Sequence, residues 1–192
     1  MTENTLMLSP GGELREDLPF KPVRIAVVTV SDTRTLDTDT SGALLAKRLQ
    51  ADGHLLADRL VVKDDVGQIR AAVRRLVDSK AADVILTTGG TGLTGRDVTP
   101  EAIEPLLDKR MEGFSTIFHL VSYEMVGLST LQSRALAGLI KGVIVFCMPG
   151  SNGACKDGWD KIIRWQLDSR HMPCNMVELM PRFNEHLTHD CA

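Results

Sequence analysis

One stretch organises the whole chain: Asp83-Val84-Ile85-Leu86-Thr87-Thr88-Gly89-Gly90-Thr91-Gly92-Leu93-Thr94-Gly95-Arg96-Asp97-Val98-Thr99-Pro100-Glu101. A continuous apolar run predicts a buried strand, and four glycines within seven positions follow it. Glycine permits positive φ and leaves main-chain N–H groups unshielded by a Cβ atom. We therefore expect a loop whose N–H groups hold phosphate oxygens. Thr99 is expected to cap the next helix and Pro100 to open it, so that the helix dipole adds positive potential.

Three other interpretations of these glycines compete with a phosphate loop. Gly90-x-Gly92-x-x-Gly95 satisfies the dinucleotide-binding template, but no helix begins inside the motif and no acidic residue ends a second strand about twenty residues later. The ATP-binding P-loop template requires Lys and Ser or Thr where Arg96-Asp97 stand. Finally, the glycines could simply turn a strand-to-helix corner. Four glycines exceed what such a short loop needs, which favours a ligand loop.

Arg96 and Asp97 stand between the glycines and the predicted helix. A fixed cation and a carboxylate beside a phosphate site are typical of phosphoryl chemistry assisted by a divalent metal ion. The sequence therefore predicts not only binding of phosphate at this loop but also chemistry on it.

Composition indicates one globular domain built around a parallel sheet. The 192 residues are 43% hydrophobic and 24% charged, but only 4% aromatic, so Val, Ile, Leu and Ala must form the core. The net charge of −3 provides no basic field for a nucleic-acid backbone, which argues against nucleic acid as a partner. There is no long apolar run and the four cysteines show no Cys-x-x-Cys pair. We expect a soluble, cytoplasmic protein that binds no membrane.

Periodicity divides the chain into an arm (1–22), a domain (23–180) and a tail (181–192). The predicted strands are 23–30, 55–62 and the apolar run before Gly89, followed by a hairpin of 131–140 with 142–148 at an edge of the sheet. Helices are predicted at about 42–52, capped by Thr40 or Ser41, and along the apolar stripes of 66–77, 103–107, 114–125 and 159–167. The arm is expected either to be disordered or to dock on a neighbouring subunit.

Other polar segments also follow predicted strands, where α/β sheets place their ligands. Asp64 and Asp65 come directly after the second strand, and either could instead cap the next helix. Pro149-Gly150-Ser151 follows the last strand and could face the glycine loop across the top of the sheet.

Four separated motifs occur in the order typical of one family: Val30-Ser31-Asp32, Asp39-Thr40-Ser41-Gly42, Thr87-Thr88-Gly89-Gly90-Thr91-Gly92 with Arg96-Asp97-Val98-Thr99-Pro100-Glu101, and Met148-Pro149-Gly150. They resemble the molybdopterin-binding family, which includes MogA, MoaB and the G domains of proteins such as gephyrin. The resemblance covers about residues 23–180. Segments such as Ser129-Thr130-Leu131-Gln132-Ser133-Arg134-Ala135 are closer to the MoaB branch than to the MogA branch.

This resemblance implies a three-layer α/β/α sandwich with a mostly parallel sheet and one antiparallel edge hairpin, assembled as a homo-oligomer of three or six copies. It also implies adenylylation of molybdopterin by Mg-ATP in molybdenum cofactor biosynthesis, with release of pyrophosphate. Other proteins of that pathway become possible partners. Two alternatives stay open: a molybdopterin-binding or auxiliary protein without catalysis, and a scaffold whose function is its oligomer.

The functional carboxylates of active family members correspond to Asp97 and to Asp64, although Asp65 is an alternative to Asp64. The resemblance places both carboxylates near Mg²⁺ on the triphosphate, and Ser133 where active members carry a functional serine. We expect Arg96 to offset charge on the departing pyrophosphate. The complete set of predicted substrate-binding residues is Ser31, Gly89, Gly90, Thr91, Gly92, Arg96, Ser133, Pro149, Gly150 and Ser151.

Overall fold

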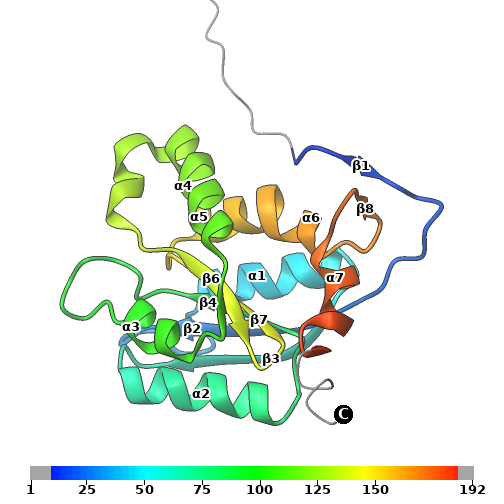
Figure 1. Ribbon diagram of the computed structural model, residues 1–192. Coiled ribbons are helices and arrows are strands. Elements are labelled where there is room, and N and C mark those ends of the chain that lie inside the picture. The colour runs from blue at the N-terminus through cyan, green and yellow to red at the C-terminus, as the bar shows by residue number, and fades with distance from the viewer. Residues whose placement is uncertain (1–9, 186–192) are drawn as a thin grey trace, which may run out of the picture.

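The computed structural model describes residues 10–185, so that parts of the predicted arm and tail, 1–9 and 186–192, lie outside the described residues. Its centre is a six-stranded sheet in the order β3-β2-β4-β7-β6-β5 (Figure 1). The parallel strands are β2 (Arg24–Val30), β3 (Leu55–Val62), β4 (Val84–Thr88) and β7 (Val143–Met148). The antiparallel strands are β6 (Leu136–Ile140) and β5 (Lys109–Arg110). The predicted, mostly parallel sheet is confirmed.

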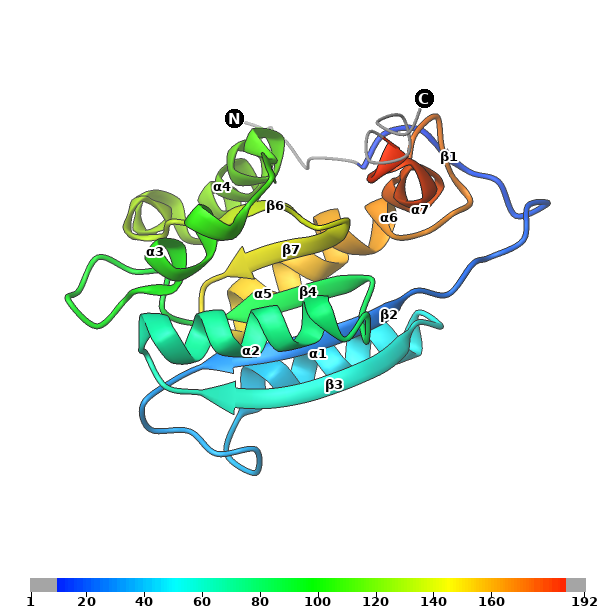
Figure 2. The same ribbon diagram turned by 60° about the horizontal axis from the view of Figure 1, so that its bottom comes forward.

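Helices cover both faces of this sheet, because its central strands are apolar on both sides. Figure 2 shows α2 (Val66–Asp78) on the face turned to the viewer and α1 (Thr40–Ala51) and α5 (Asn152–Gly158) behind the sheet. Successive strand residues alternate between two cores: Val27 packs with the α1 side and Val28 with the α2 side. The predicted three-layer α/β/α sandwich is therefore confirmed.

The remaining elements complete these layers. The α2 face also carries α3 (Thr99–Ile103) and the 3-10 helix η1 (Glu104–Leu106). The opposite core includes side chains of α4 (Glu112–Val126), of the π-helical turn η3 (Trp159–Ile163) and of α7 (Met176–Leu179). Shorter segments connect them: η2 (Gly127–Gln132), α6 (Arg164–Gln166) and η4 (Met180–Arg182).

The predicted edge hairpin needs two corrections. Its first strand begins at Leu136 rather than at 131, because residues 127–132 form the 3-10 helix η2. The outermost strand is not part of the hairpin, since the two-residue strand β5 pairs with β6 beyond it. A short edge strand limits the unpaired main-chain groups that the sheet exposes.

The cap of α1 was also predicted wrongly. Asp39, not Thr40 or Ser41, precedes the helix and accepts a hydrogen bond from the Gly42 N–H at 2.9 Å. The hydroxyl of Thr29 and the guanidinium of Arg59 donate to the same carboxylate, at 2.8 and 3.0 Å. Burial alone would raise the pKa of Asp39, but these donors outweigh it and lower the pKa. The buried carboxylate thus joins β2, β3 and α1.

The described part of the arm packs on its own chain. Strand β1 (Glu13–Leu14) pairs antiparallel with β8 (His171–Met172), and the Ser169 hydroxyl donates to Pro19 O at 3.1 Å. Among residues 10–185, no helix is both long and apolar enough to cross a membrane. The described cysteines, Cys147, Cys155 and Cys174, are free thiols.

Candidate functional site

A pocket of about 430 Å³ opens where β2, β4 and β7 end, at their carboxyl ends. Side chains and main chain from five loops meet there, which is where parallel α/β sheets bind ligands. The lining residues are Thr29, Val30, Ser31, Thr33, Arg34, Ser41, Asp64, Thr88, Gly89, Gly90, Thr91, Gly92, Arg96, Asp97, Gln132, Ser133, Pro149 and Gly150.

The glycine loop forms the floor of this pocket and has no room for larger residues. Gly89 and Gly90 have φ values of +105° and +63°, a conformation that L-residues with a Cβ rarely adopt. A Cβ on Gly90 would lie 2.5 Å from the Thr99 hydroxyl and 2.9 Å from Asp64 Oδ1. A Cβ on Gly92 would lie 2.7 Å from Asp97 Oδ2. Both acidic side chains therefore lie against the loop.

The helix after the loop differs from its prediction. Thr99 does not cap α3 but begins it, and its hydroxyl donates to Gly89 O at 2.8 Å while its N–H donates to Gly90 O at 2.9 Å. The residue before the helix, Val98, makes no side-chain cap. Because α3 has only five residues, the expected helix dipole is weak, and Thr99 acts by holding the loop.

The structure distinguishes between Asp64 and Asp65. Asp65 faces outward and caps α2, accepting from the Gln68 N–H at 2.8 Å, whereas Asp64 lines the pocket. Burial, together with the negative charges of Asp32 and Asp97, raises the pKa of Asp64, although the Asp32 N–H and Arg96 oppose the shift. Asp64 is thus the carboxylate that the pocket brings beside the glycine loop.

Asp97 reaches the same pocket from the far end of the loop. Its Oδ2 accepts from the Thr94 N–H at 2.9 Å and from the Thr94 hydroxyl at 2.6 Å. These bonds are the main reason that the pKa of Asp97 is lowered. The pocket therefore combines two carboxylates whose pKa values are shifted in opposite directions, an arrangement that is common at functional sites.

Arg96 spans the mouth of the pocket and pairs with Asp32, a residue not among the predicted site residues. Its Nε donates to Asp32 Oδ2 at 2.9 Å, and its Nη2 donates to the same oxygen. The Arg96 side chain is 69% exposed, so this pair contributes little to stability. Arg96 can consequently exchange Asp32 for an anionic ligand at small cost.

Arg34 supplies a second cation that the predictions missed. It lines the pocket, donates to the Ser41 hydroxyl at 2.9 Å and lies 3.8 Å from Asp39. The Ser31 hydroxyl accepts from the Arg34 N–H at 3.3 Å, which fixes the turn between them. In the sequence, Arg34 lies in the polar loop after the first strand and at the end of Thr29-Val30-Ser31-Asp32-Thr33-Arg34, a segment that shares the family resemblance.

The predicted serines are in three different situations. Ser31 and Ser133 line the pocket, and the buried Ser133 Oγ has no hydrogen-bond partner among residues 10–185. A buried hydroxyl without a partner is costly, which suits a group that receives its partner from a ligand. Ser151 lies outside the lining, and its hydroxyl caps α5 by accepting from the Ala154 N–H at 3.1 Å. Its neighbours Pro149 and Gly150 do line the pocket.

Arg134 anchors the glycine loop from outside and was also missed as a site residue. Its main-chain N–H donates to Thr91 O at 2.9 Å. In its side chain, Nε donates to Gly92 O at 2.9 Å and Nη2 donates to Asp97 O at 2.8 Å. Its Nη1 pairs with Glu101. One side chain therefore connects both ends of the loop.

Within residues 10–185, no group of three or more His, Cys, Asp or Glu side chains gathers as a metal site. Mg²⁺ is usually bound by only one or two carboxylates together with phosphate oxygens and water. Asp64 and Asp97, as hard oxygen ligands beside the glycine loop, fit that type of site.

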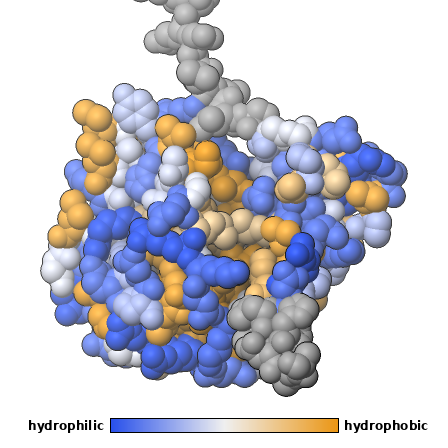
Figure 3. All heavy atoms as spheres, viewed as in Figure 1, coloured by the Kyte–Doolittle hydropathy of each residue, from blue (hydrophilic) through white to orange (hydrophobic). Residues whose placement is uncertain are grey.

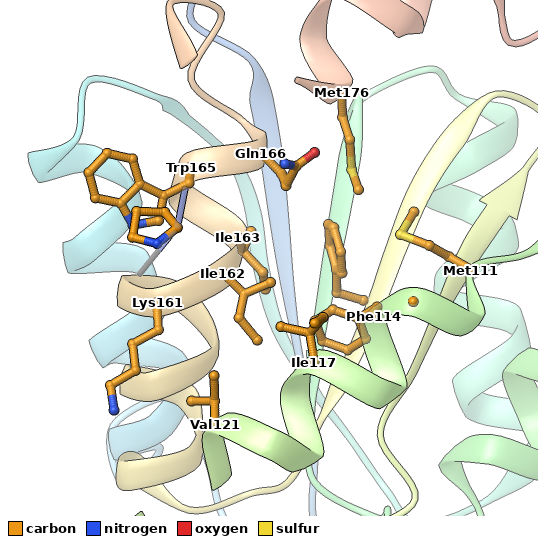
Figure 4. A pocket seen from close by; sticks show the side chains of 13 residues that line it. Met111, Phe114, Ile117, Val121, Lys161, Ile162, Ile163, Trp165, Gln166 and Met176 are labelled. Atoms are coloured by element: carbon orange, nitrogen blue, oxygen red, sulfur yellow. The ribbon is translucent and has the colours of Figure 1, made fainter. Parts of the chain in front are cut away.

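A second pocket, of about 410 Å³, is apolar and lies between α4, η3 and α7. Figure 4 shows Phe114, Ile117, Ile162 and Met176 pointing into it, with Lys161 to one side. It has no cluster of ionisable groups. Its chemistry is that of a packing surface, so the polar pocket is the candidate functional site.

Comparison with known proteins gives independent information on the family of the chain. A family model described as a probable molybdopterin binding domain matches residues 26–169. Molybdenum cofactor biosynthesis protein B of Escherichia coli strain K12 is 47% identical over 156 residues, which are 81% of this chain and 92% of that protein. The protein of the same name from Bacillus cereus is 47% identical over 144 residues, 74% of this chain and 85% of its own.

Solved structures give the same result. A crystal structure of molybdenum cofactor biosynthesis protein B has a TM-score of 0.76 at 46% identity, covering 78% of this chain and 94% of that one. The tungsten cofactor synthesizing protein MoaB from Pyrococcus furiosus has a TM-score of 0.66 at 34% identity, covering 90% of this chain and 98% of that one. With a family match over most of its length and relatives that share nearly half of its residues, the chain belongs to the molybdopterin-binding family and is similar, within it, to the molybdenum cofactor biosynthesis B proteins.

Proposed function

We propose that this protein acts in molybdenum cofactor biosynthesis and adenylylates molybdopterin with Mg-ATP. In this reaction a terminal phosphate oxygen of molybdopterin attacks the α-phosphorus of ATP. The bond to the bridging oxygen breaks, adenylyl-molybdopterin forms and pyrophosphate leaves. Membership of the family supports molybdopterin as the ligand, and the polar pocket supports the phosphoryl chemistry.

The observation that carries the proposal is the position of Asp64 and Asp97 against the glycine loop. The close approach of Asp64 to Gly90 and of Asp97 to Gly92 leaves the main chain of the loop and two carboxylates around one pocket. The Gly89 N–H is not available to a ligand, because it donates to Met148 O at 3.0 Å. Main-chain N–H groups favour phosphate, and carboxylates disfavour it unless a cation lies between them. A nucleotide that arrives with Mg²⁺ satisfies both halves of the pocket.

The residues need not include a strong general base. A phosphate monoester has a second pKa near 6 and is largely ionised at neutral pH, so the nucleophile is already prepared. Catalysis then depends on placement and on neutralisation of charge. Arg96 at the mouth and Arg34 on the wall provide positive charge for the pyrophosphate, and the loop N–H groups orient the phosphates. The unpartnered Ser133 hydroxyl is available to bind nucleotide or pterin.

Asp64 and Asp97 are the residues that would hold Mg²⁺, directly or through water. When bound, this ion neutralises negative charge on the triphosphate. Asp97 is held ionised by its Thr94 bonds. The raised pKa of Asp64 falls back when a cation approaches, because the positive charge favours the ionised form.

An exposed apolar face on α4 and η2 supports assembly as a homo-oligomer of three or six copies. Leu120, Tyr123, Leu128 and Leu131 are 49%, 56%, 70% and 71% exposed. Figure 3 shows the apolar atoms of this face at the upper left of the molecule. Several large apolar side chains exposed on neighbouring elements are typical of an interface between subunits.

The test is an assay of purified protein with molybdopterin, ATP and Mg²⁺, comparing wild type with Asp97→Ala. We expect adenylyl-molybdopterin from the wild type and a loss of about 100-fold or more in the variant, the usual cost of removing a group that stabilises transition-state charge. Equal rates would remove Asp97 from the mechanism. Binding of molybdopterin without any product from the wild type would instead identify a pterin-binding protein, and ATP binding measured by calorimetry would separate that outcome from a scaffold.

A further inference from the structure

A third pocket, of about 420 Å³, lies at the opposite end of the sheet from the glycine loop. His54 comes directly before β3, and its Nδ1 accepts from the N–H of Val23, directly before β2, at 3.3 Å. The pocket is therefore at the amino ends of these strands, whereas the glycine loop follows the carboxyl ends. It is lined by Phe20, Ala51, Asp52, Gly53, His54, Arg164, Asp168 and Arg170.

His54 is almost completely buried, with 4% of its surface exposed. Because Nδ1 accepts a hydrogen bond, the neutral ring carries its proton on Nε2. Burial is the main reason that the pKa of His54 is lowered, although Asp52 and Asp168 oppose the shift, so the ring is neutral at pH 7. Its Nε2 makes no hydrogen bond to any residue between 10 and 185. This N–H donor is therefore available to a ligand in the pocket.

The two carboxylates of the pocket are already engaged. Asp52 accepts from the Trp159 indole at 2.7 Å and lies 3.4 Å from Arg164. Asp168 accepts from the Nε and Nη2 of Arg170 at 3.0 and 2.8 Å, and from its main-chain N–H at 2.9 Å. Each carboxylate is therefore already paired with an arginine of the same pocket.

The donors of this pocket are less fully engaged. Within the described chain, the Arg164 guanidinium makes no hydrogen bond, and the Nη1 of Arg170 makes none. Both arginines are nevertheless positioned, Arg164 over the Trp165 ring at 5.3 Å and Arg170 over Phe20 at 5.2 Å. Two guanidinium groups with free N–H donors and one neutral imidazole N–H therefore border one polar pocket.

We propose that this pocket binds a small oxyanion group, a phosphate or a carboxylate, between the Nε2 of His54 and the guanidinium of Arg164. Such a group offers only acceptors, which complements the N–H groups of Arg164, Arg170 and His54 that make no hydrogen bond. The site is independent of the adenylylation pocket, because no residue lines both.

The test follows the binding of inorganic phosphate and, separately, of acetate to the full-length protein at constant ionic strength. NMR of protein labelled at histidine Cε1 and at main-chain nitrogen reports the pocket through His54 and Gly53, and the glycine loop through Gly89 and Gly92. We expect saturable shifts at His54 and Gly53, and the tighter of the two anions identifies the chemical class. Shifts confined to the glycine loop, or no shift at His54 and Gly53 with either anion, would refute the site.

Two substitutions of His54 separate binding from folding. His54→Asn keeps an acceptor near the Nδ1 position for Val23 but removes the Nε2 donor, whereas His54→Gln keeps a donor near Nε2. We expect binding to weaken about tenfold in the Asn variant and to be largely retained in the Gln variant. Arg164→Gln, at a side chain 41% exposed, should also weaken binding about tenfold with an unchanged melting temperature.

The rate of adenylylation by Arg164→Gln should equal that of the wild type. The proposed adenylylation and the proposed anion site can therefore be refuted independently of each other. Unchanged anion affinity in both His54→Asn and Arg164→Gln would show that the pocket does not hold the anion in the proposed way, whatever the outcome of the adenylylation assay.

Discussion

The Nη2 of Arg134 donates to the main-chain carbonyl of Asp97 at 2.8 Å, while its Nε donates to Gly92 O at 2.9 Å. The same side chain thus fixes the glycine loop and the residue that carries one of its two carboxylates. Because the guanidinium is a rigid fork, the two carbonyls are held at one separation.

Arg134→Lys should therefore damage the site although it keeps the charge. An ammonium cannot replace both N–H donors in their fixed geometry. We expect a loss of about 1–3 kcal/mol in the free energy of unfolding and weaker binding of Mg-ATP by calorimetry. Arg75→Lys is the matched control, since Arg75 pairs with Asp58 on the exposed side of α2, and it should change both quantities little. Equal effects of the two substitutions would contradict the anchoring role.

Two glycines of the same loop should respond differently to the same substitution. In Gly92→Ala the new methyl would lie 2.7 Å from Asp97 Oδ2 and displace that carboxylate. Gly95→Ala places its methyl in open space, at a backbone without positive φ. We expect adenylylation to fall at least tenfold in the first variant, through displacement of a charged group, and to change less than twofold in the second. Similar activities of the two variants would show that the Asp97 position is unimportant.

The strands and the glycine loop were predictable because they are local patterns: apolar runs of strand length, and glycines that end one of them. The predictions that failed concern helix caps, which depend on tertiary contacts. Thr40 and Ser41 are good helix caps in isolation, but Asp39 is preferred because Thr29 and Arg59 stabilise its charge from neighbouring strands. In the same way, Thr99 resembles a cap but bonds Gly89 instead.

The candidate site shows the same division. Asp64 and Asp97 were identified by resemblance, and only the fold shows that Asp65 turns outward to cap α2. Arg34, Asp32 and Arg134 were missed as site residues because their roles come from pairing across 7 to 64 positions of sequence. Neither hydrophobic periodicity nor motif spacing in the sequence predicts such distant pairs.

The buried network around Asp39 predicts a large loss in Asp39→Ala. Removing the carboxylate deletes the cap of α1 and leaves Arg59 without its ion-pair partner, at an expected cost of about 2–4 kcal/mol in urea unfolding. Thr40→Ala is the matched control at the next position, where the exposed hydroxyl only contacts Asn152. A larger effect at Thr40 would restore the original prediction of the cap.

The pH dependence of the same pair has a definite sign. The folded-state pKa of Asp39 is lowered, so its contribution to stability is present above the unfolded pKa of about 3.9 and is lost as the pH falls through the folded value. The stability difference between wild type and Asp39→Asn should therefore shrink in acid. A difference that stays constant down to pH 2 would contradict this assignment.

The apolar face on α4 and η2 predicts dissociation when it is charged. Leu128→Asp and Leu120→Asp should each shift the molar mass in light scattering toward that of one chain, because a charge in an apolar interface loses its hydration. Leu36→Asp, at a leucine that is 50% exposed in the loop before α1, should leave the molar mass unchanged. A monomeric wild type would refute the oligomer directly.

Asp64 should affect stability in the direction opposite to Asp39. Burial and the charges of Asp32 and Asp97 raise its folded-state pKa, so its contribution to stability is complete only below the unfolded pKa and is lost as the pH rises through the folded value. Asn carries no charge to desolvate, and Asp64→Asn should therefore melt at a higher temperature than wild type at pH 7 in EDTA. The gain should disappear near pH 3, where both side chains are neutral. Asp65→Asn serves as the control, because its cap is exposed and Asn caps helices equally well. If Asp64→Asn melts at or below the wild-type temperature at pH 7, the carboxylate is not strained by its surroundings, and the pocket needs no cation to relieve it.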